Sequence, residues 1–254
     1  MVLTANSMAI HPMSKLTAKQ NQSGFSLIEL VVAMAVTLVL MGVAVTLLAR
    51  SLNIRARETE HVDELADVQR ALNIMSREIS NSGFNMINNG IVAADSNRNA
   101  IRIRANLNKF NFDASVSADS RRLVQDPGED ITYFVNAAGN TNYLARWDRF
   151  ESSGPGVDLR GTVLANRVDG VRFYYFDEKV TYTQDPDNCA ITTMLNSAGA
   201  AEAEVAPNLA NFVVLLVCIN TPAVGTPGSD GYQRPYRTVM ISDVALRNSN
   251  LNKY

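Results

Sequence analysis

A single run of apolar residues near the start of the chain constrains its fold more than any other feature. Residues 30–49 carry no charge, and only Thr37, Gly42 and Thr46 interrupt their apolar character. These 20 residues would form a helix of about 30 Å, the thickness of the hydrocarbon core of a bilayer. A removable secretory signal has a shorter apolar run and a small-residue cleavage site, a pattern that is missing after Ala49. The run therefore predicts a single membrane helix that stays with the mature chain.

One carboxylate, Glu29, stands at the start of this run, behind a polar segment. That segment, "MSKLTAKQNQSG" at residues 13–24, has Lys15 and Lys19 as its only charges. The candidate start residues are Met1, Met8 and Met13. A charge near the centre of a bilayer costs about 2.5 to 3.5 kcal/mol, so such residues usually have a partner. The position of Glu29 therefore calls for a second charged group.

The stretch "GFSLIEL", residues 24–30, resembles the type III signal of type IV prepilins and pseudopilins, because it follows a short basic leader and precedes a membrane-length helix. The resemblance implies that a prepilin peptidase removes residues 1–24 by cutting after Gly24. It also implies that the peptidase methylates the new amine of Phe25. The freed amine is a cation at the depth of Glu29, and in the family such a pair forms between neighbouring subunits and sets their axial register.

Two alternatives stay open at this point. Glu29 at the headgroup level would simply stabilise the positive end of the helix dipole. The count of positive charge, with Arg50, Arg55 and Arg57 after the helix, does not favour an exported C-terminal part and leaves a cytoplasmic domain possible. The leader motif instead implies a single-pass protein of the bacterial inner membrane, with its head in the periplasm and later in a pilus (fimbrium) at the cell surface.

Residues 50–83 continue as an amphipathic stalk helix after the membrane and assembly helix of residues 25–49. One apolar face is predicted to contain Val62, Leu65, Leu72, Met75 and Ile79. The charged positions expected to face solvent or another subunit are Asp63, Glu64, Asp67, Arg70, Arg77 and Glu78. We expect the helix to run to about Ser80 and to end before "SNSGFN", where Gly83 suits a left-handed conformation.

Residues 84–254 contain short strand-like runs separated by turn residues, which predict an α+β head domain in which the stalk helix packs on a mostly antiparallel β-sheet. The resemblance of the leader implies that this head is periplasmic. The predicted strands are residues 100–107, 130–136, 142–150, 160–168, 170–177, 211–219 and 236–246. Residues 213–219 are continuously apolar, which predicts a central strand covered on both faces, one of them by the stalk helix. Residues 151–161 and 220–235 are predicted loops, and residues 178–208 an irregular insert.

The two cysteines, Cys189 and Cys218, match no metal-ligand spacing. In an exported domain they favour a disulfide, which would staple the insert to the central strand. Two buried thiols are the alternative.

The sequence gives little sign of catalysis or of a cofactor. Its two histidines are His11 and His61, so the head has none, and no catalytic triad or histidine-based zinc site is expected there. Asp185 and Asp187 lie in "DPDN", which favours a turn over a calcium loop. The aromatic stretch 173–176 is expected to alternate between core and surface, and the net charge of −2 gives no reason to predict a nucleic-acid partner. We expect neither an enzyme nor a metal or cofactor site.

Two further stretches narrow the resemblance. Residues 74–85, "IMSREISNSGFN", resemble the helix end of PilW-type minor pilins and J-type pseudopilins, and residues 237–248 resemble their C-terminal strand. The implied function is that of a minor pilin in a type IV pilus, which enters the filament or primes its assembly. The implied partners are the prepilin peptidase, other major and minor pilins, the inner-membrane assembly platform and, before assembly, membrane lipid. A type II secretion pseudopilin and a membrane-anchored adhesin or binding module are the alternatives.

Overall fold

The computed structural model describes residues 24–107, 124–138, 141–151, 158, 160–228 and 232–248. The chain divides into two compact units, residues 1–52 and 53–254. One helix, α1 (Leu27–Ser80), begins in the first unit and ends in the second. The helix confirms the expected end at Ser80.

The described part of the first unit is the apolar half of α1. Its large apolar side chains are all exposed, with Leu38 at 68% and Leu48 at 60%. No other described helix is long and apolar enough to cross a membrane. An apolar surface of this kind needs lipid or other helices around it.

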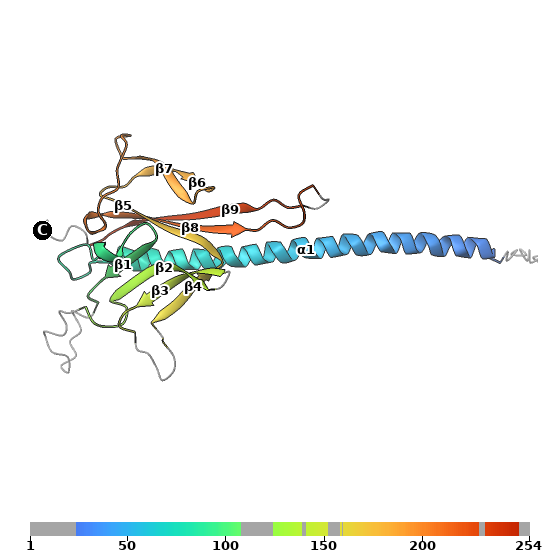
Figure 1. The fold of residues 1–254 in the computed structure, drawn as a ribbon, viewed down its shortest axis with the longest axis horizontal. Helices are drawn as coiled ribbons and strands as arrows, with labels where there is room; N and C mark the ends of the chain where they lie inside the picture. Colours follow the sequence, from blue (N-terminus) through green and yellow to red (C-terminus); the bar gives the residue numbers. More distant parts are fainter. Residues whose placement is uncertain are drawn as a thin grey trace, which may run out of the picture. The chain divides into compact units, whose positions relative to one another are not determined.

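The second unit contains the rest of α1 and the β-sheets (Figure 1). One sheet has the order β1-β2-β3-β4, and its strands are β1 (Ala100–Arg104), β2 (Asp130–Ala138), β3 (Thr141–Asp148) and β4 (Gly161–Asn166). A second has the order β5-β8-β9, and its strands are β5 (Val168–Phe176), β8 (Phe212–Thr221) and β9 (Tyr236–Ala245). A hairpin pairs β6 (Thr181–Asp185) with β7 (Ala190–Leu195), and two short 3-10 helices are η1 (Ala93–Asp95) and η3 (Pro207–Leu209). All of these strand pairs are antiparallel, so the predicted α+β class is confirmed, with three sheets in place of one.

The helix packs on the sheets through one face, whose buried residues are Val68, Ala71, Leu72, Met75 and Ile79. These residues share one apolar core with side chains from both larger sheets. Leu65 is partly buried against this core, but Val62 is 59% exposed. The predicted face was therefore wrong at Val62, where the apolar core does not reach.

Strand β8 is the central strand of its sheet and is covered on both faces, as predicted. Val213, Leu215 and Val217 lie in the core shared with the helix. Val214 and Leu216 lie in a second core, which the β6–β7 hairpin covers. The prediction of an irregular insert at residues 178–208 was thus wrong, because the insert contains this hairpin.

The neighbouring strand β5 is buried on both faces along its aromatic residues 173–176. Phe173 and Tyr175 lie in the core shared with the helix, whereas Tyr174 and Phe176 lie in the second core. The expected alternation between core and surface was therefore wrong, since the hairpin buries the face that was assigned to solvent.

Two glycines let the chain turn sharply after the helix. Gly83 and Gly90 both have positive φ, at 72° and 75°. The Gly83 N–H donates to the Arg104 carbonyl at 2.8 Å, and the Arg104 N–H donates to the Gly90 carbonyl at 2.8 Å. A Cβ on Gly90 would lie 2.1 Å from the Gly83 nitrogen, so only glycine fits there.

Candidate functional site

The candidate processing site lies directly before the helix. Gly24, Phe25 and Ser26 are not helical, and Phe25 is 87% exposed. The Leu30 N–H donates to the Ser26 carbonyl at 3.1 Å, so Ser26 is the N-cap of α1. The bond after Gly24 therefore lies in exposed chain outside the helix.

Glu29 lies in the first turn of the helix and accepts a hydrogen bond from the Ser26 backbone N–H, at 3.2 Å. This contact is half of a capping box, in which a Glu three residues after the N-cap returns to the N-cap amide. The sequence signal for it is the serine-to-glutamate spacing in "SLIE", which the sequence interpretation did not use. With the Gly24–Phe25 bond intact, Glu29 thus has a local role as a cap.

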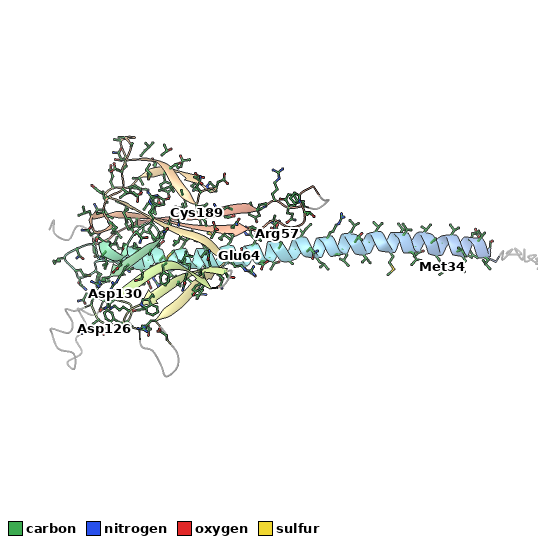
Figure 2. All side chains as sticks on the ribbon, in the orientation of Figure 1. Met34, Arg57, Glu64, Asp126, Asp130 and Cys189 are labelled. Atoms are coloured by element: carbon green, nitrogen blue, oxygen red, sulfur yellow. A yellow bond between two sulfur atoms is a disulfide. The ribbon has the colours of Figure 1, made fainter. Side chains whose placement is uncertain are left out.

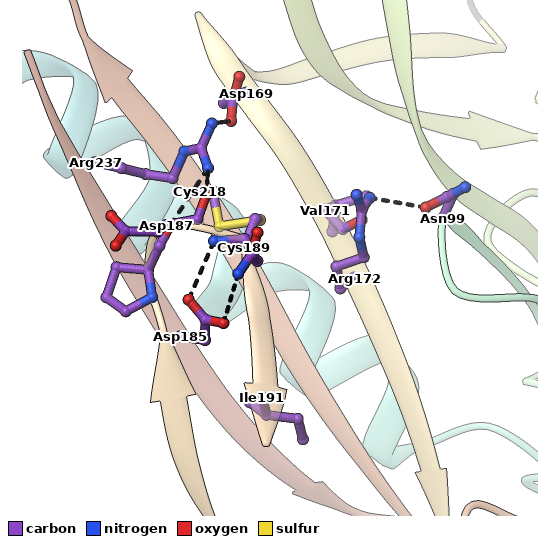
Figure 3. Close-up of a disulfide and its surroundings, with 12 residues drawn as sticks. Asn99, Asp169, Val171, Arg172, Asp185, Asp187, Cys189, Ile191, Cys218 and Arg237 are labelled. Atoms are coloured by element: carbon purple, nitrogen blue, oxygen red, sulfur yellow. Dashed lines mark hydrogen bonds and ion pairs between the residues drawn. A yellow bond between two sulfur atoms is a disulfide. The ribbon is translucent and has the colours of Figure 1, made fainter.

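The predicted disulfide between Cys189 and Cys218 is confirmed (Figure 3), with a Cα–Cα distance of 6.0 Å. Cys189 is the last residue of the turn between β6 and β7, and Cys218 lies in β8. Arg237 in β9 supports the same turn, because its guanidinium pairs with Asp169 at 2.6 Å and donates to the Asp187 carbonyl. The bridge and this arginine together fix the hairpin over the second core.

Residues 185–188, "DPDN", lie at the turn that the sequence predicts for them. The Asn188 side chain donates to the Asp185 carboxylate at 2.8 Å, and these hydrogen bonds lower the pKa of Asp185. Among the described residues no group of three or more His, Cys, Asp or Glu side chains is placed to hold a metal ion. Asp185 therefore closes a turn.

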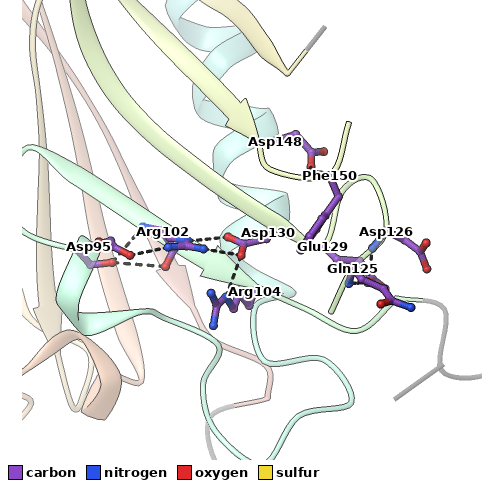
Figure 4. A network of polar contacts seen from close by, with 10 residues as sticks. Asp95, Arg102, Arg104, Gln125, Asp126, Glu129, Asp130, Asp148 and Phe150 are labelled. Atoms are coloured by element: carbon purple, nitrogen blue, oxygen red, sulfur yellow. Dashed lines mark hydrogen bonds and ion pairs between the residues drawn. The ribbon is translucent and has the colours of Figure 1, made fainter. Parts of the chain in front are cut away.

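A buried charge network, missed in the sequence interpretation, joins β1 to β2 (Figure 4). Asp130 is 2% exposed and accepts hydrogen bonds from Arg102 at 2.7 Å and Arg104 at 3.0 Å. Burial alone would raise the pKa of Asp130, but the bonds and charges of the two arginines outweigh it and hold that pKa below its usual range. The signal was "RIR" in β1, which puts both arginines on one strand face.

Two stalk carboxylates that were predicted to face solvent or another subunit contact the head instead. Glu78 accepts hydrogen bonds from the Tyr133 hydroxyl and, at 3.1 Å, from the Arg146 Nε. Burial and the nearby Glu78 raise the pKa of Tyr133. Glu64 pairs with Arg167 at 3.2 Å, and burial raises the pKa of Glu64. The predicted position facing solvent or another subunit was therefore wrong for Glu64 and Glu78. Glu78 ties the helix to the four-stranded sheet, and Glu64 ties it to the turn before β5.

The start of the stalk helix in the second unit is tied to the end of the β8–β9 hairpin (Figure 2). The Arg57 guanidinium donates to the Pro222 carbonyl at 2.9 Å and to the Gln233 side chain, and it lies 5.7 Å from the ring centre of Tyr236. His61 contacts the Thr221 hydroxyl at 3.2 Å. The positive charge of Arg57 is thus bound by groups of the β8–β9 hairpin.

Comparisons with known proteins give one match. A family model described as the prokaryotic N-terminal methylation motif matches residues 19–45. No curated protein and no solved structure matches the chain. The matched segment includes Gly24, Phe25 and Glu29 and leads into the apolar half of α1. The chain therefore carries a prepilin methylation motif on a pilin-like architecture, with a long N-terminal helix and an antiparallel β-sheet head.

Proposed function

We propose that this protein is a minor pilin of a type IV pilus, made as a prepilin. A prepilin peptidase removes residues 1–24 and methylates the amine of Phe25, and residues 25–49 then hold the subunit in the inner membrane until it enters the filament. The observation that carries the proposal is the methylation motif at residues 19–45, which extends into the N-terminal half of α1, where the large apolar side chains are exposed.

Glu29 has two roles in this proposal, at two stages. In the precursor it caps the helix through the Ser26 N–H. After cleavage it pairs with the positive amine of a neighbouring subunit's Phe25 and so offsets the cost of both charges in an apolar surrounding. The head domain then has a structural role and presents its surface to other pilins.

Two substitutions separate these roles of Glu29. Glu29→Gln keeps an oxygen that accepts the Ser26 N–H but removes the charge, whereas Glu29→Ala removes both. An unpaired amine costs about 2.5 to 3.5 kcal/mol, so both variants should enter filaments about a hundredfold less than the wild type. The measurement is the amount of the protein in sheared filaments relative to the membrane fraction. Glu58→Gln, an exposed carboxylate outside the motif, is the matched control.

Wild-type incorporation of Glu29→Gln would show that the cap, and not the charge, is what matters, and the pairing would be wrong. The Cys189–Cys218 disulfide should still form in every variant, which separates an assembly defect from a folding defect.

A further inference from the structure

A polar pocket lies within the second unit, where α1 meets the ends of both larger sheets. Its volume is about 710 Å³, which is in the range of pockets that hold small molecules. Four parts of the chain line it: residues 53–64 of α1, the start of β3, the link from β4 to β5, and the end of β8 with the residues after it. Arg57, whose guanidinium is bound by the β8–β9 hairpin, and Glu64 both line it (Figure 2).

The other charged groups of the pocket also have protein partners. Arg167 contacts Glu60 and pairs with Glu64 at 3.2 Å. The backbone holds Arg167 in the left-handed region, with a φ of 57°, a strained conformation of the kind that gathers at binding sites. Asp169 pairs with Arg237 at 2.6 Å. A charged ligand would have to compete with these pairs, so the pocket favours a neutral ligand.

The neutral polar side chains of the pocket, in contrast, are free to bind a ligand. They are exposed, and within the described chain they have no hydrogen-bond partner; they are Asn53, Thr141, Asn142 and Asn220. Each side-chain amide can donate and accept hydrogen bonds at the same time. The pocket thus offers several such groups on α1, β3 and β8, directed at one volume of about 710 Å³.

We propose that this pocket binds a neutral saccharide. The hydroxyl groups of a sugar donate and accept as the free amides do, and they carry no charge that would disturb the pairs of Arg167. An apolar ligand would leave the amides without partners. A peptide would need apolar pockets for its side chains, but the apolar part of the lining is small and consists of Ala56, Val168, Pro222 and Val224. This inference does not rest on the proposed function.

Binding is measured on the purified full chain by saturation-transfer NMR, in micelles of a detergent that has no sugar headgroup. The probes are three neutral disaccharides: diacetylchitobiose, cellobiose and maltose. Because the pocket is polar and open, we expect a Kd of about 1 mM for at least one of them.

Removal of the free amides tests the pocket itself. A neutral hydrogen bond contributes about fivefold in affinity, so Asn142→Ala and Asn220→Ala should each weaken binding about fivefold, and together about 25-fold. Asn73→Ala, which changes an exposed asparagine of α1 outside the pocket, is the matched control and should bind like the wild type. Ala56→Trp puts a large ring into the pocket and should abolish binding. All four substituted side chains are exposed, so the urea midpoint of each variant should stay near that of the wild type.

Three results would overturn the proposal. The first is no binding of any of the three disaccharides well above the expected Kd. The second is amide variants that bind as tightly as the wild type. The third is tighter binding of a charged probe, glucose 6-phosphate or glucosamine, or of the neutral peptide acetyl-trialanine amide.

Mass analysis of the same samples reports the N-terminus and keeps the two proposals apart. A chain that begins at Phe25 but binds no sugar refutes only the saccharide pocket. A chain that binds the sugar but keeps residues 1–24 in cells that have the peptidase refutes only the proposed function.

Discussion

The disulfide of the head gives the prediction with the clearest magnitude. Cys189 and Cys218 are 29 residues apart, and a crosslink over a loop of that length is expected to stabilise the fold by about 3.6 kcal/mol through the unfolded chain. Reduction leaves the other contacts of the hairpin, such as the Tyr182 hydroxyl on Asp243 at 2.6 Å. The reduced head should therefore stay folded but lose stability by about that amount.

Urea unfolding of the full chain in detergent micelles measures this loss. With an m-value of about 2 kcal/mol/M, the midpoint should fall by about 1.8 M on reduction. The Cys189→Ala/Cys218→Ala variant is the matched control, because it should unfold near the reduced wild type and should not respond to reductant. Limited proteolysis of the reduced chain should cut first in the hairpin.

Equal midpoints for the oxidised and reduced wild type would refute the reasoning. That result would mean that the hairpin is held over the second core by noncovalent contacts alone, among them the pair between Arg237 and Asp169.

Three further predictions concern the stability of the head. Glu78→Ala leaves the buried Tyr133 hydroxyl and the half-buried Arg146 guanidinium without their acceptor, so it should lower the free energy of unfolding in urea by about 3 kcal/mol. The control Arg77→Ala, one residue away, should lower it by less than about 0.5 kcal/mol. The pKa of Asp130 is lowered in the folded state, so its stabilisation is present above about pH 4 and is lost as the pH falls through the folded pKa. Asp130→Asn should thus lower the melting temperature at pH 7, and the melting temperature of the variant should fall less than that of the wild type as the pH is lowered. An equal fall in the two proteins would count against a stabilising role of the Asp130 network. Gly90→Ala forces a Cβ against backbone and should cost at least about 4 kcal/mol, whereas Gly199→Ala, with a similar φ but open space, should cost about 1 to 2. Equal losses in the two glycine variants would show that φ, and not the close approach, is what requires glycine at position 90.

The sequence predicts those elements that a pattern of consecutive residues is enough to reveal. The apolar run of α1 and the continuous apolar stretch of β8 are both visible as one-dimensional patterns, and both are confirmed. The disulfide also followed from simple reasoning, because the chain has two cysteines and an exported head favours their pairing.

The missed features depend on partners far away in the sequence. The β6–β7 hairpin is mostly polar, and Cys189 and Thr193 have positive φ without being glycine, so neither its strands nor its turn gives the usual signal. Its apolar contacts form only where it meets β5 and β8.

The same limit explains the stalk carboxylates. In the sequence, Glu78 looks like any polar position on a helix. Its partner Tyr133 is 55 residues away and reaches the Glu78 carboxylate only in the folded chain. Val62 fits an apolar helix period, yet it remains exposed because a helical period does not reveal how far the head extends along the helix.

The central claim is tested most directly by the mass of the mature N-terminus, measured on protein purified from membranes of cells that have the prepilin peptidase. We expect a chain that begins at Phe25 and carries one added methyl group on its amine. Cells that lack the peptidase, and a Gly24→Val variant, should yield the unprocessed chain. A mature protein that still begins at Met1 or Met13 in the presence of the peptidase would contradict the account.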